Sequence, residues 1–586
     1  MTITSSYLSR ARRARVRWAL GGLLCLLLAA CAARGPIDQP DPSEAPVASV
    51  ADANWDRWSA DFLEGYFELY PATAVRAGRH EFDGQVPDLS ARGLKARVDR
   101  LRRYREEARA FAAAALSVDR RFERELAIWY IGRSLFWLTE SRWRTQNPML
   151  NRAAVNPSVY LTRSYAPLPV RMAGLTRLLE AMPLALEQIE QQLDAALPRS
   201  YLRRSIGYYG GLARHLKRTV PAVFDGIGTG ASQAALQRVN ADAIAALTAF
   251  REALEARRGA ATADFALGRD RFVRMLEQRE MITEPLLELK ALGQRDLERN
   301  LQALLTLCRE ALDTPDPQAC MTIAEVGKSL DPVARGRAQL PALKAFVQER
   351  DLVTIPSEEE ALVEQSPPYN RANLAYISIP GAFEPDPLPS VYYISPPDPQ
   401  WGEAEQRAFV PNEGRLLYVS VHEVWPGHFL WGLHRNRAER PLVRLFTSTT
   451  FSEGWAHYVE EMMHDEGLSA GDPRLHLGQL ANALKRNVRY LSAIGMHTEG
   501  MTQEESEQRF LTQALLDPGN ARQQAARGTY DPGYLSYTLG KLQILKLRED
   551  WFAAHPDGTL KAFHDELLSY GGAPLNLIRR YMLPAG

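Results

Sequence analysis

Residues 421–428 read Val-His-Glu-Val-Trp-Pro-Gly-His, and residues 451–456 read Phe-Ser-Glu-Gly-Trp-Ala. Together they supply two imidazoles, a carboxylate beside the first imidazole, and a second carboxylate on a later segment. Catalytic zinc sites use three nitrogen or oxygen ligands from the protein, leave a fourth position to water, and need a nearby acid–base group. Seven of the eleven histidines lie between His422 and His497. This region is therefore the first candidate for a metal site.

The two histidines are six residues apart, whereas the common His-Glu-x-x-His motif separates them by four. On a straight helix, six residues place the two side chains roughly 120° out of alignment. Pro426 and Gly427 lie between them; proline removes an intrahelical hydrogen bond, and glycine permits unusual dihedral angles. We expect the helix to kink or end there, which would turn His428 back toward His422. The alternative is a helix that stops at Pro-Gly and carries two unrelated surface histidines.

These residue types suggest separate roles at a zinc ion. His422 and His428 are candidate ligands. Glu423 is the candidate general base, which would take a proton from water and pass it to the leaving nitrogen; an ordinary surface glutamate is the alternative. On the helix expected from Phe451 onward, four side chains share one face, so one could be a ligand and another could support a ligand from behind. They are Glu453, His457, Glu460 and His464, and a solvated polar face would show the same pattern.

The N-terminus predicts export. Residues 10–17 contain five arginines, and an apolar run follows from Trp18 to Ala33. This run is too short for a comfortable membrane span but is typical of a signal peptide. It includes Leu28-Ala29-Ala30-Cys31, which resembles a bacterial lipobox, and in such lipoproteins the cysteine is acylated and becomes the mature N-terminus. We therefore expect a signal peptide over residues 1–31 and lipidation of Cys31; an uncleaved anchor is the alternative.

A tether is expected after Cys31. Residues 32–52 are rich in Pro, Asp and Ala, which is typical of a disordered linker. Ala32 directly after the cysteine resembles lipoproteins that are sent to the outer membrane. The prediction is a bacterial lipoprotein on the periplasmic side of that membrane, attached through the lipid on Cys31.

Beyond the tether, the composition predicts a large globular body. Cys308 and Cys320 could form a disulfide in an oxidising periplasm or remain as two buried thiols. The net charge is zero and no basic patch is evident, so nucleic acid is not an expected partner. About 535 residues, nearly half of them apolar, can bury a large core.

Helical periodicity dominates the body, so the expected fold class is mainly α. We expect a helical region over residues 53–350 and a region with the metal site over 351–586, within one continuous domain over 53–586. The best strand candidates are 375–379 and 390–394, which predict a small β element just before the metal-binding helix. The expected helices are Asn54–Tyr70, Leu94–Leu116, Asp119–Trp137, Pro169–Ala196, Tyr201–Lys217, Ser232–Arg257, Ala261–Met281 and Pro285–Leu312.

Four segments resemble the bacterial domain-of-unknown-function 885 family: 421–428, 451–460, 489–497 and 532–541. The resemblance runs through most of the chain after the tether. Members are predominantly helical, often lipoproteins, and related to zinc metallopeptidases of the thermolysin-like superfamily. The resemblance implies one Zn²⁺ ion in a deep cleft, Glu453 as the third ligand, and Glu460 as a carboxylate that supports a ligand. His457, on the same helix face, is a further candidate for such support.

The helical oligopeptidases of that superfamily line their cleft with Tyr-x-x-x-Tyr-x-x-Tyr, and three tyrosines here have that spacing. A phenol can donate a hydrogen bond to the oxyanion that forms when water attacks a carbonyl. Tyr537 is the first candidate for this role and Tyr534 the second; tyrosines packed at a helix start are the alternative. Arg489 and His497 could bind a substrate carboxylate or the oxyanion, although a structural ion pair would equally explain Arg489. The three tyrosines are Tyr530, Tyr534 and Tyr537.

The expected activity is zinc-dependent hydrolysis of short peptides. One alternative is a binding or scaffolding lipoprotein that keeps the peptidase fold without catalysis. Another is a metal-dependent hydrolase of a different amide or ester. Substrate identity, endo- or exo-specificity and oligomeric state do not follow from the sequence.

Overall fold

Helices make up most of the computed structural model, which describes residues 49–583 except 324–330, 368–370, 372–373, 387, 398 and 401. The mainly α prediction is confirmed. The predicted signal peptide, the lipidation site Cys31 and the tether up to residue 48 lie outside the described residues.

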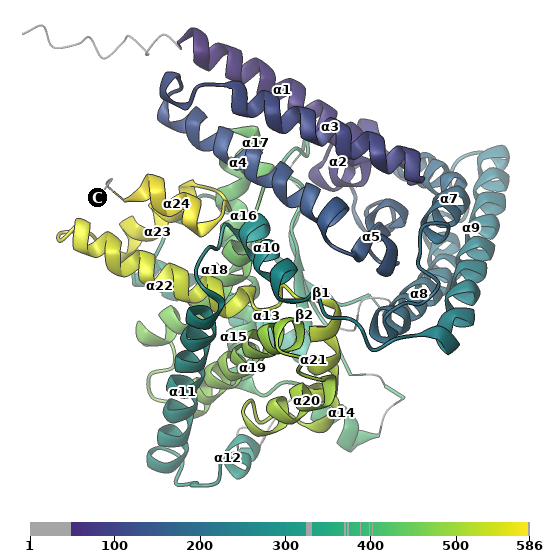
Figure 1. Ribbon diagram of the computed structural model, residues 1–586. Coiled ribbons are helices and arrows are strands. Elements are labelled where there is room, and N and C mark those ends of the chain that lie inside the picture. Colours follow the sequence, from purple (N-terminus) through teal and green to yellow (C-terminus); the bar gives the residue numbers. More distant parts are fainter. Residues whose placement is uncertain are drawn as a thin grey trace, which may run out of the picture. The chain divides into compact units, whose positions relative to one another are not determined.

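The first helices pack side by side (Figure 1). The first of them begins at Val50, two residues before the predicted end of the tether at residue 52, because Ser49 caps it: the Ser49 hydroxyl accepts the Asp52 N–H. The elements of this region are α1 (Val50–Leu69), α2 (Pro71–Ala77), α3 (Ala91–Ala110), α4 (Val118–Leu135), α5 (Trp143–Gln146), α6 (Ser158–Thr162), α7 (Leu168–Glu190), α8 (Arg199–Phe224) and α9 (Gly230–Ala256).

The helix predicted over Ala261–Met281 is shorter in the structure. It begins only at Arg269, because the Thr262 backbone is held by hydrogen bonds to Leu197 and Arg199 and because Gly268 has a φ of 82°. The next elements are α10 (Arg269–Glu280), α11 (Leu286–Glu310), α12 (Pro317–Ile323) and α13 (Pro332–Glu349). A disulfide between Cys308 and Cys320 joins α11 to α12. The structure therefore contains the predicted disulfide and not the alternative, two buried free thiols.

A three-stranded sheet precedes the helix that carries His422. Its strands are β1 (Leu362–Gln365), β2 (Ala375–Ser378) and β3 (Val391–Ile394), in the order β1-β3-β2. β3 pairs parallel with β1 and antiparallel with β2. The two predicted strands are confirmed. β1 was not predicted. Only one of its four residues, Val363, is buried, so apolar and polar residues do not alternate along it.

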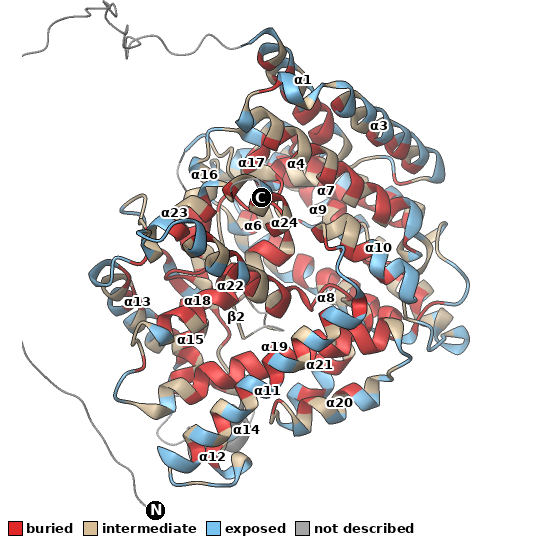
Figure 2. Ribbon diagram, turned by 60° about the vertical axis from the view of Figure 1, so that its left-hand side comes forward, coloured by how far each residue is buried: buried red, intermediate tan, exposed pale blue. Residues whose placement is uncertain are grey.

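The remaining helices build the region around the proposed site. α18 packs along α22, and α19 packs along both α15 and α11, which ties the two predicted regions of the body together. Most residues of α18 and α19 are buried (Figure 2). The helices of this region are α14 (Glu403–Phe409), α15 (Glu413–Glu423), α16 (His428–Arg437), α17 (Pro441–Leu445), α18 (Thr449–Asp465), α19 (Pro473–Thr498), α20 (Gln503–Thr512), α21 (Pro518–Tyr530), α22 (Ser536–Ala554), α23 (Leu560–Ser569) and α24 (Leu575–Met582).

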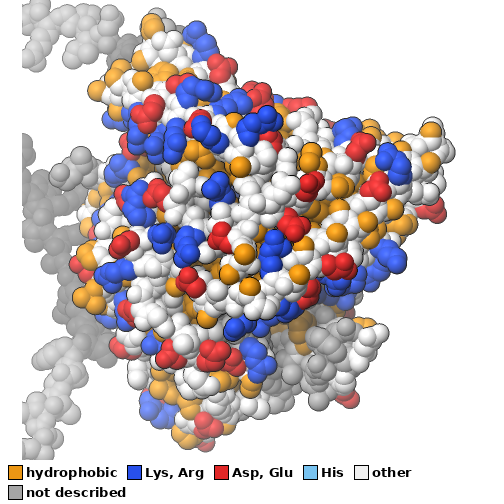
Figure 3. Space-filling model, turned by 45° about the vertical axis from the view of Figure 1, so that its right-hand side comes forward, with side chains coloured by type: hydrophobic (Ala, Val, Ile, Leu, Met, Phe, Trp, Pro, Cys, Tyr) orange, Lys and Arg blue, Asp and Glu red, His pale blue; other side chains and the backbone are white. Residues whose placement is uncertain are grey.

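The described residues from Ser49 onward belong to one compact unit. None of the helices in this described part combines the length and the apolar character that a membrane crossing requires. Basic and acidic side chains are interspersed on the face shown in Figure 3.

Two glycines allow α18 and α22 to approach closely, and α18 carries Glu453. A Cβ atom at Gly540 would collide with the Thr450 carbonyl oxygen and lie 2.6 Å from the Gly454 Cα. We therefore expect Gly540→Ala to lower the free energy of unfolding by about 1–3 kcal/mol, because overpacking forces the backbones apart. Urea denaturation measures this.

Gly207 is the matched control for that substitution. It lies on an exposed position of α8, and no atom lies within 4 Å of a Cβ built there. Gly207→Ala should stabilise the protein by about 0.5–1 kcal/mol, as alanine does within helices. Equal effects of the two substitutions would show that the close contact between α18 and α22 is absent.

Candidate metal centre

The segment between the two histidines folds back on itself. α15 ends at Glu423 and α16 begins at His428. Of the two predicted possibilities, a kink or an end of the helix, the structure shows the end. The Gly427 N–H donates to the Val421 carbonyl oxygen at 3.0 Å. A side chain on Gly427 would collide with the His422 carbonyl, so this turn requires glycine.

This turn brings the two imidazoles together. The ring centroids of His422 and His428 are 4.8 Å apart and their planes are nearly perpendicular, at 83°. The indole N–H of Trp455 on α18 donates to the Pro426 carbonyl at 2.9 Å and fixes the turn against that helix. The two histidines are therefore parts of one arrangement, and the alternative of unrelated surface residues is wrong.

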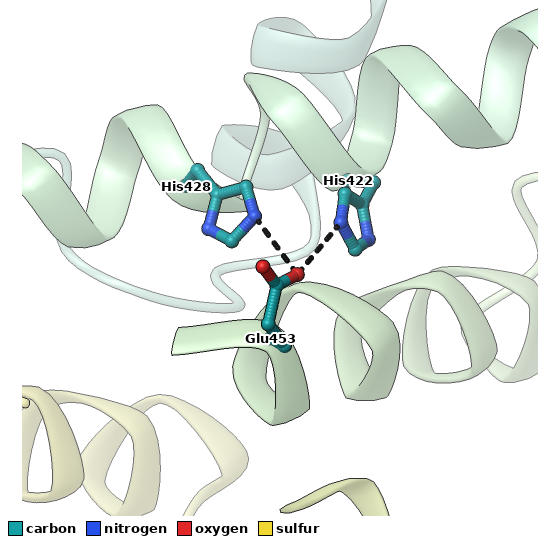
Figure 4. Close-up of side chains that lie close together, drawn as sticks. All are labelled: His422, His428 and Glu453. Carbon is teal, nitrogen blue, oxygen red and sulfur yellow. Dashed lines mark ion pairs between the residues drawn. The ribbon is translucent and has the colours of Figure 1, made fainter. Parts of the chain in front are cut away.

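Glu453 completes the group from the second turn of α18. Its Oε2 lies 3.6 Å from Nε2 of His422 and 3.5 Å from Nε2 of His428. Figure 4 shows the carboxylate pointing between the two rings. Among the described residues, these three are the one group of at least three His, Cys, Asp or Glu side chains whose ligand atoms converge within 4.8 Å.

The donor atoms fit a zinc ion. Bonds of about 2.0–2.1 Å in a tetrahedral arrangement separate two ligand atoms by about 3.3 Å, which is close to the measured 3.5 and 3.6 Å. Two nitrogens and one carboxylate oxygen are the donor set of catalytic zinc sites, whereas structural sites use mainly thiolates. The side chains of His428 and Glu453 keep 14% and 23% of their surface exposed, so both are partly open to solvent.

Charge is concentrated at this group. Burial works against ionisation of Glu453, but the two imidazoles outweigh it and hold the pKa of its carboxyl well below 4.5. Burial and the charge of Arg486 lower the pKa of His422, but the carboxylates of Glu453 and Glu460 outweigh them and raise it to about 9. Without a metal, a proton on His422 therefore supplies the positive charge between these carboxylates.

Glu460 lies behind His422, as the resemblance implied. Its Oε1 is 2.8 Å from Nδ1 of His422, and Arg486 holds both carboxylate oxygens at 2.8–2.9 Å. All three side chains are buried. A carboxylate that accepts the Nδ1 proton fixes the tautomer and leaves the Nε2 lone pair directed at the ligand position.

We expect Glu460→Gln to weaken zinc binding by about 10–100-fold, because the amide no longer supports His422 as a base. Competition titration with a chromophoric chelator measures the dissociation constant. Glu461→Gln is the matched control, since Glu461 is the next residue on α18 but pairs with Arg299 and Lys541. A loss of affinity in both variants, or in neither, would contradict the role of Glu460.

Glu423 lies at the edge of the sheet. Its Oε2 accepts the N–H of Ile377 on β2 at 3.1 Å. β2 is an edge strand, so this N–H faces away from β3. No second hydrogen bond and no ion pair of Glu423 occurs among the described residues, and the side chain is only partly buried. One carboxylate oxygen is therefore available to other groups.

Tyr537 is the one predicted tyrosine beside the metal ligands. Its ring lies 6.2 Å from the His422 ring, at an interplanar angle of 20°. Three guanidinium groups lie 5.1–5.9 Å from the centre of the Tyr537 ring, namely those of Arg486, Arg489 and Arg527.

The other two tyrosines point elsewhere. Tyr534 is buried, with its hydroxyl packed against Gly528. The ring of Tyr530 lies 4.0 Å from the guanidinium of Arg204 on α8. In the described part of the chain, no hydrogen bond or ring contact joins either tyrosine to the metal ligands, so these two residues fit the alternative of tyrosines packed at a helix start.

The remaining predicted histidines are also buried away from the ligand atoms. His497 bonds to backbone through both nitrogens, with the Leu267 N–H at 3.3 Å and the Gly528 carbonyl at 2.8 Å, and burial lowers its pKa to about 4. His457 is fully buried, and neither of its ring nitrogens has a hydrogen-bond partner in the described part of the chain. Its Nδ1 lies 3.9 Å from Glu460, so it contacts the support of His422 and not the metal position.

Comparison with protein families gives a match over residues 71–582 to the family described as "Bacterial protein of unknown function (DUF885)". The chain belongs to the DUF885 family. A candidate lipoprotein of unknown function from Shewanella oneidensis has a similar fold, with a TM-score of 0.74, 20% identity, and coverage of 90% of this chain and 100% of that one. A candidate lipoprotein from Colwellia psychrerythraea has a TM-score of 0.75, 17% identity, and coverage of 92% and 99%. The comparison with curated proteins gives no match.

Two parts of this DUF885 site were missed by the sequence analysis. Arg486 forms the link between Glu460 and α19, and the only signal was its position three residues before Arg489, on the same helix face. The backbone N–H of Ile377 could not be recognised from the sequence, because every residue except proline would present an N–H at that position of β2.

Proposed function

We propose that this DUF885 protein is a zinc-dependent peptide hydrolase. The observation that carries the proposal is the convergence of His422 Nε2, His428 Nε2 and Glu453 Oε2 on one position, with Glu423 next in sequence to the first ligand. A site for a purely structural metal has no use for that free carboxylate. One Zn²⁺ ion fits the donor set best among biological metals.

The roles of the side chains follow from their positions. A bound zinc ion would polarise the scissile carbonyl and acidify the attacking water. Glu423 takes the proton from that water on its free oxygen and delivers it to the leaving nitrogen, while Ile377 holds its other oxygen. Tyr537 donates a hydrogen bond to the oxyanion from beside His422. Glu460 and Arg486 keep His422 in place.

We also propose that the protein is a lipoprotein, acylated at Cys31 and located on the periplasmic side of the outer membrane. The lipobox supports this, as do the two structural relatives, which are themselves candidate lipoproteins. The disulfide between Cys308 and Cys320 supports an oxidising compartment, because such bonds are rare in the cytosol.

The test is hydrolysis of a defined library of short peptides, followed by mass spectrometry. The zinc-loaded protein should cleave at amide bonds, and a chelator should stop the reaction until zinc is restored. Stoichiometric zinc with no peptide cleaved would favour a binding or scaffolding lipoprotein. Cleavage of esters or non-peptide amides alone would favour a different hydrolase.

A further inference from the structure

Three basic side chains near the metal centre have no acidic partner. They are Arg415 on α15 and Lys485 and Arg489 on α19, and none of them forms an ion pair among the described residues. Arg489 is only 7% exposed, and its single side-chain hydrogen bond runs from Nε to the neutral Gln524 at 2.8 Å. The ammonium of Lys485 has only the Asn482 amide oxygen at 3.5 Å.

Two other buried cations, on α19 and α22, are paired with carboxylates. Lys541 lies 2.9 Å from both Asp296 and Glu461, and Arg486 is held by Glu460. A buried charge without a counter-ion is costly, because neither water nor a carboxylate compensates the loss of solvation. The neighbouring charges repel one another as well: burial, together with Arg489, Arg486 and Arg415, lowers the pKa of Lys485 well below 10.5. The arrangement therefore lacks an anion.

One of the unpaired cations, Arg489, lies beside Tyr537, a proposed catalytic residue. The guanidinium of Arg489 is 5.1 Å from the centre of the Tyr537 ring, and that ring is 6.2 Å from the His422 ring. One residue of an extended peptide spans about 3.3–3.6 Å. The guanidinium of Arg489 is therefore no more than about three residues' length from the His422 ring, so a peptide whose scissile carbonyl lies at His422 and Glu453 would bring a group up to three residues further along to Arg489.

We infer that Arg489, with Lys485 and Arg415, binds the free C-terminal carboxylate of a peptide substrate. This inference rests on the proposed function and makes the protein a peptidase that removes up to about three residues from the C-terminus. Water adds its oxygen to the acyl carbon, the C–N bond breaks, and the leaving amine takes the proton. A guanidinium suits this ligand because its parallel N–H groups match the two oxygens of a carboxylate.

Binding of matched peptides tests the inference without depending on turnover. The probes are acetyl-Ala-Ala-Phe as the free acid, its C-terminal amide, and acetyl-Ala-Asp-Phe-amide, titrated calorimetrically into the chelator-treated protein. Without zinc, the carboxylate has no metal to bind. The free acid should bind at least about tenfold more tightly than the amide, as expected for a hydrogen bond to a buried charged group.

Variants assign the preference to Arg489. In Arg489→Gln the acid and the amide should bind equally, and Arg489→Lys should retain part of the preference, which guards against a misfolded Gln variant. Arg435→Gln is the control, because Arg435 lies over Trp431 beyond His428 and also lacks an acidic partner. It should keep the full preference.

The outcomes separate this inference from the proposed function. Equal binding of acid and amide would overturn the inference, even if zinc-dependent cleavage occurs. Tight binding of the aspartate-containing amide would also overturn it, because the site would then recognise a side-chain carboxylate. An Arg489-dependent preference for the acid, with no cleavage of any peptide, would support the carboxylate site and refute the hydrolase.

Discussion

Glu423→Gln is expected to retain zinc and to lose peptide cleavage by about 10²–10⁴-fold, the usual contribution of general acid–base catalysis. The carboxamide keeps the shape of the side chain, and its oxygen can still accept the Ile377 N–H. It cannot take a proton from water at neutral pH. Because Glu423 is not one of the three converging ligands, the metal should remain. Elemental analysis for zinc and kcat/KM on a cleaved peptide measure the two effects.

Glu413→Gln is the control on the same helix. Glu413 lies in the first turn of α15, is exposed, and pairs with Arg335 far from the ligands, so cleavage should be unchanged. Full activity in Glu423→Gln would exclude Glu423 as the base. Loss of zinc from that variant would assign Glu423 a structural role in the site.

Glu453→Gln is expected to abolish stoichiometric zinc binding and, with it, all cleavage. The substitution removes the anionic ligand and the charge that holds the two imidazoles around one position. The loss of affinity should exceed the 10–100-fold expected for a residue that only supports a ligand. Zinc that binds only the folded state stabilises it by about 4 kcal/mol at a thousandfold excess over its dissociation constant. Zinc should therefore raise the melting temperature of the wild-type protein and leave that of the variant unchanged.

His464→Gln is the control for this prediction. His464 lies on the same helix but stacks on His476 at 3.6 Å, away from the ligands. Its melting temperature should rise with zinc as in the wild type. A zinc-dependent rise that survives in Glu453→Gln would show that the ion binds elsewhere.

The local architecture of the site could be predicted because it depends on residues close in sequence. The Pro426–Gly427 pair marks where the helix ends, and the structure shows why glycine is needed there: a Cβ atom at this position would collide with the His422 carbonyl. Glu453 followed from the resemblance. Glu460 lies seven residues after it, which is two turns on the same helix face.

Tertiary contacts could not be predicted in the same way. Tyr530, Tyr534 and Tyr537 have a spacing that suggests one cluster, yet a break in the helix at Asp531 to Leu535 sends their side chains in different directions. His497 is of a residue type that is common in active sites, but its two ring nitrogens form hydrogen bonds with backbone groups of two distant segments. The absence of an acidic partner for Arg489 depends on residues from α19, α21 and α22 together, so no local pattern could reveal it.

Anomalous X-ray scattering at the zinc edge, from crystals of the wild-type protein grown with zinc, tests the central claim most directly. We predict a single strong peak about 2.0–2.1 Å from Nε2 of His422, Nε2 of His428 and a carboxylate oxygen of Glu453. A zinc peak at another position, or no peak at these three residues with zinc in excess, would contradict the proposed metal centre.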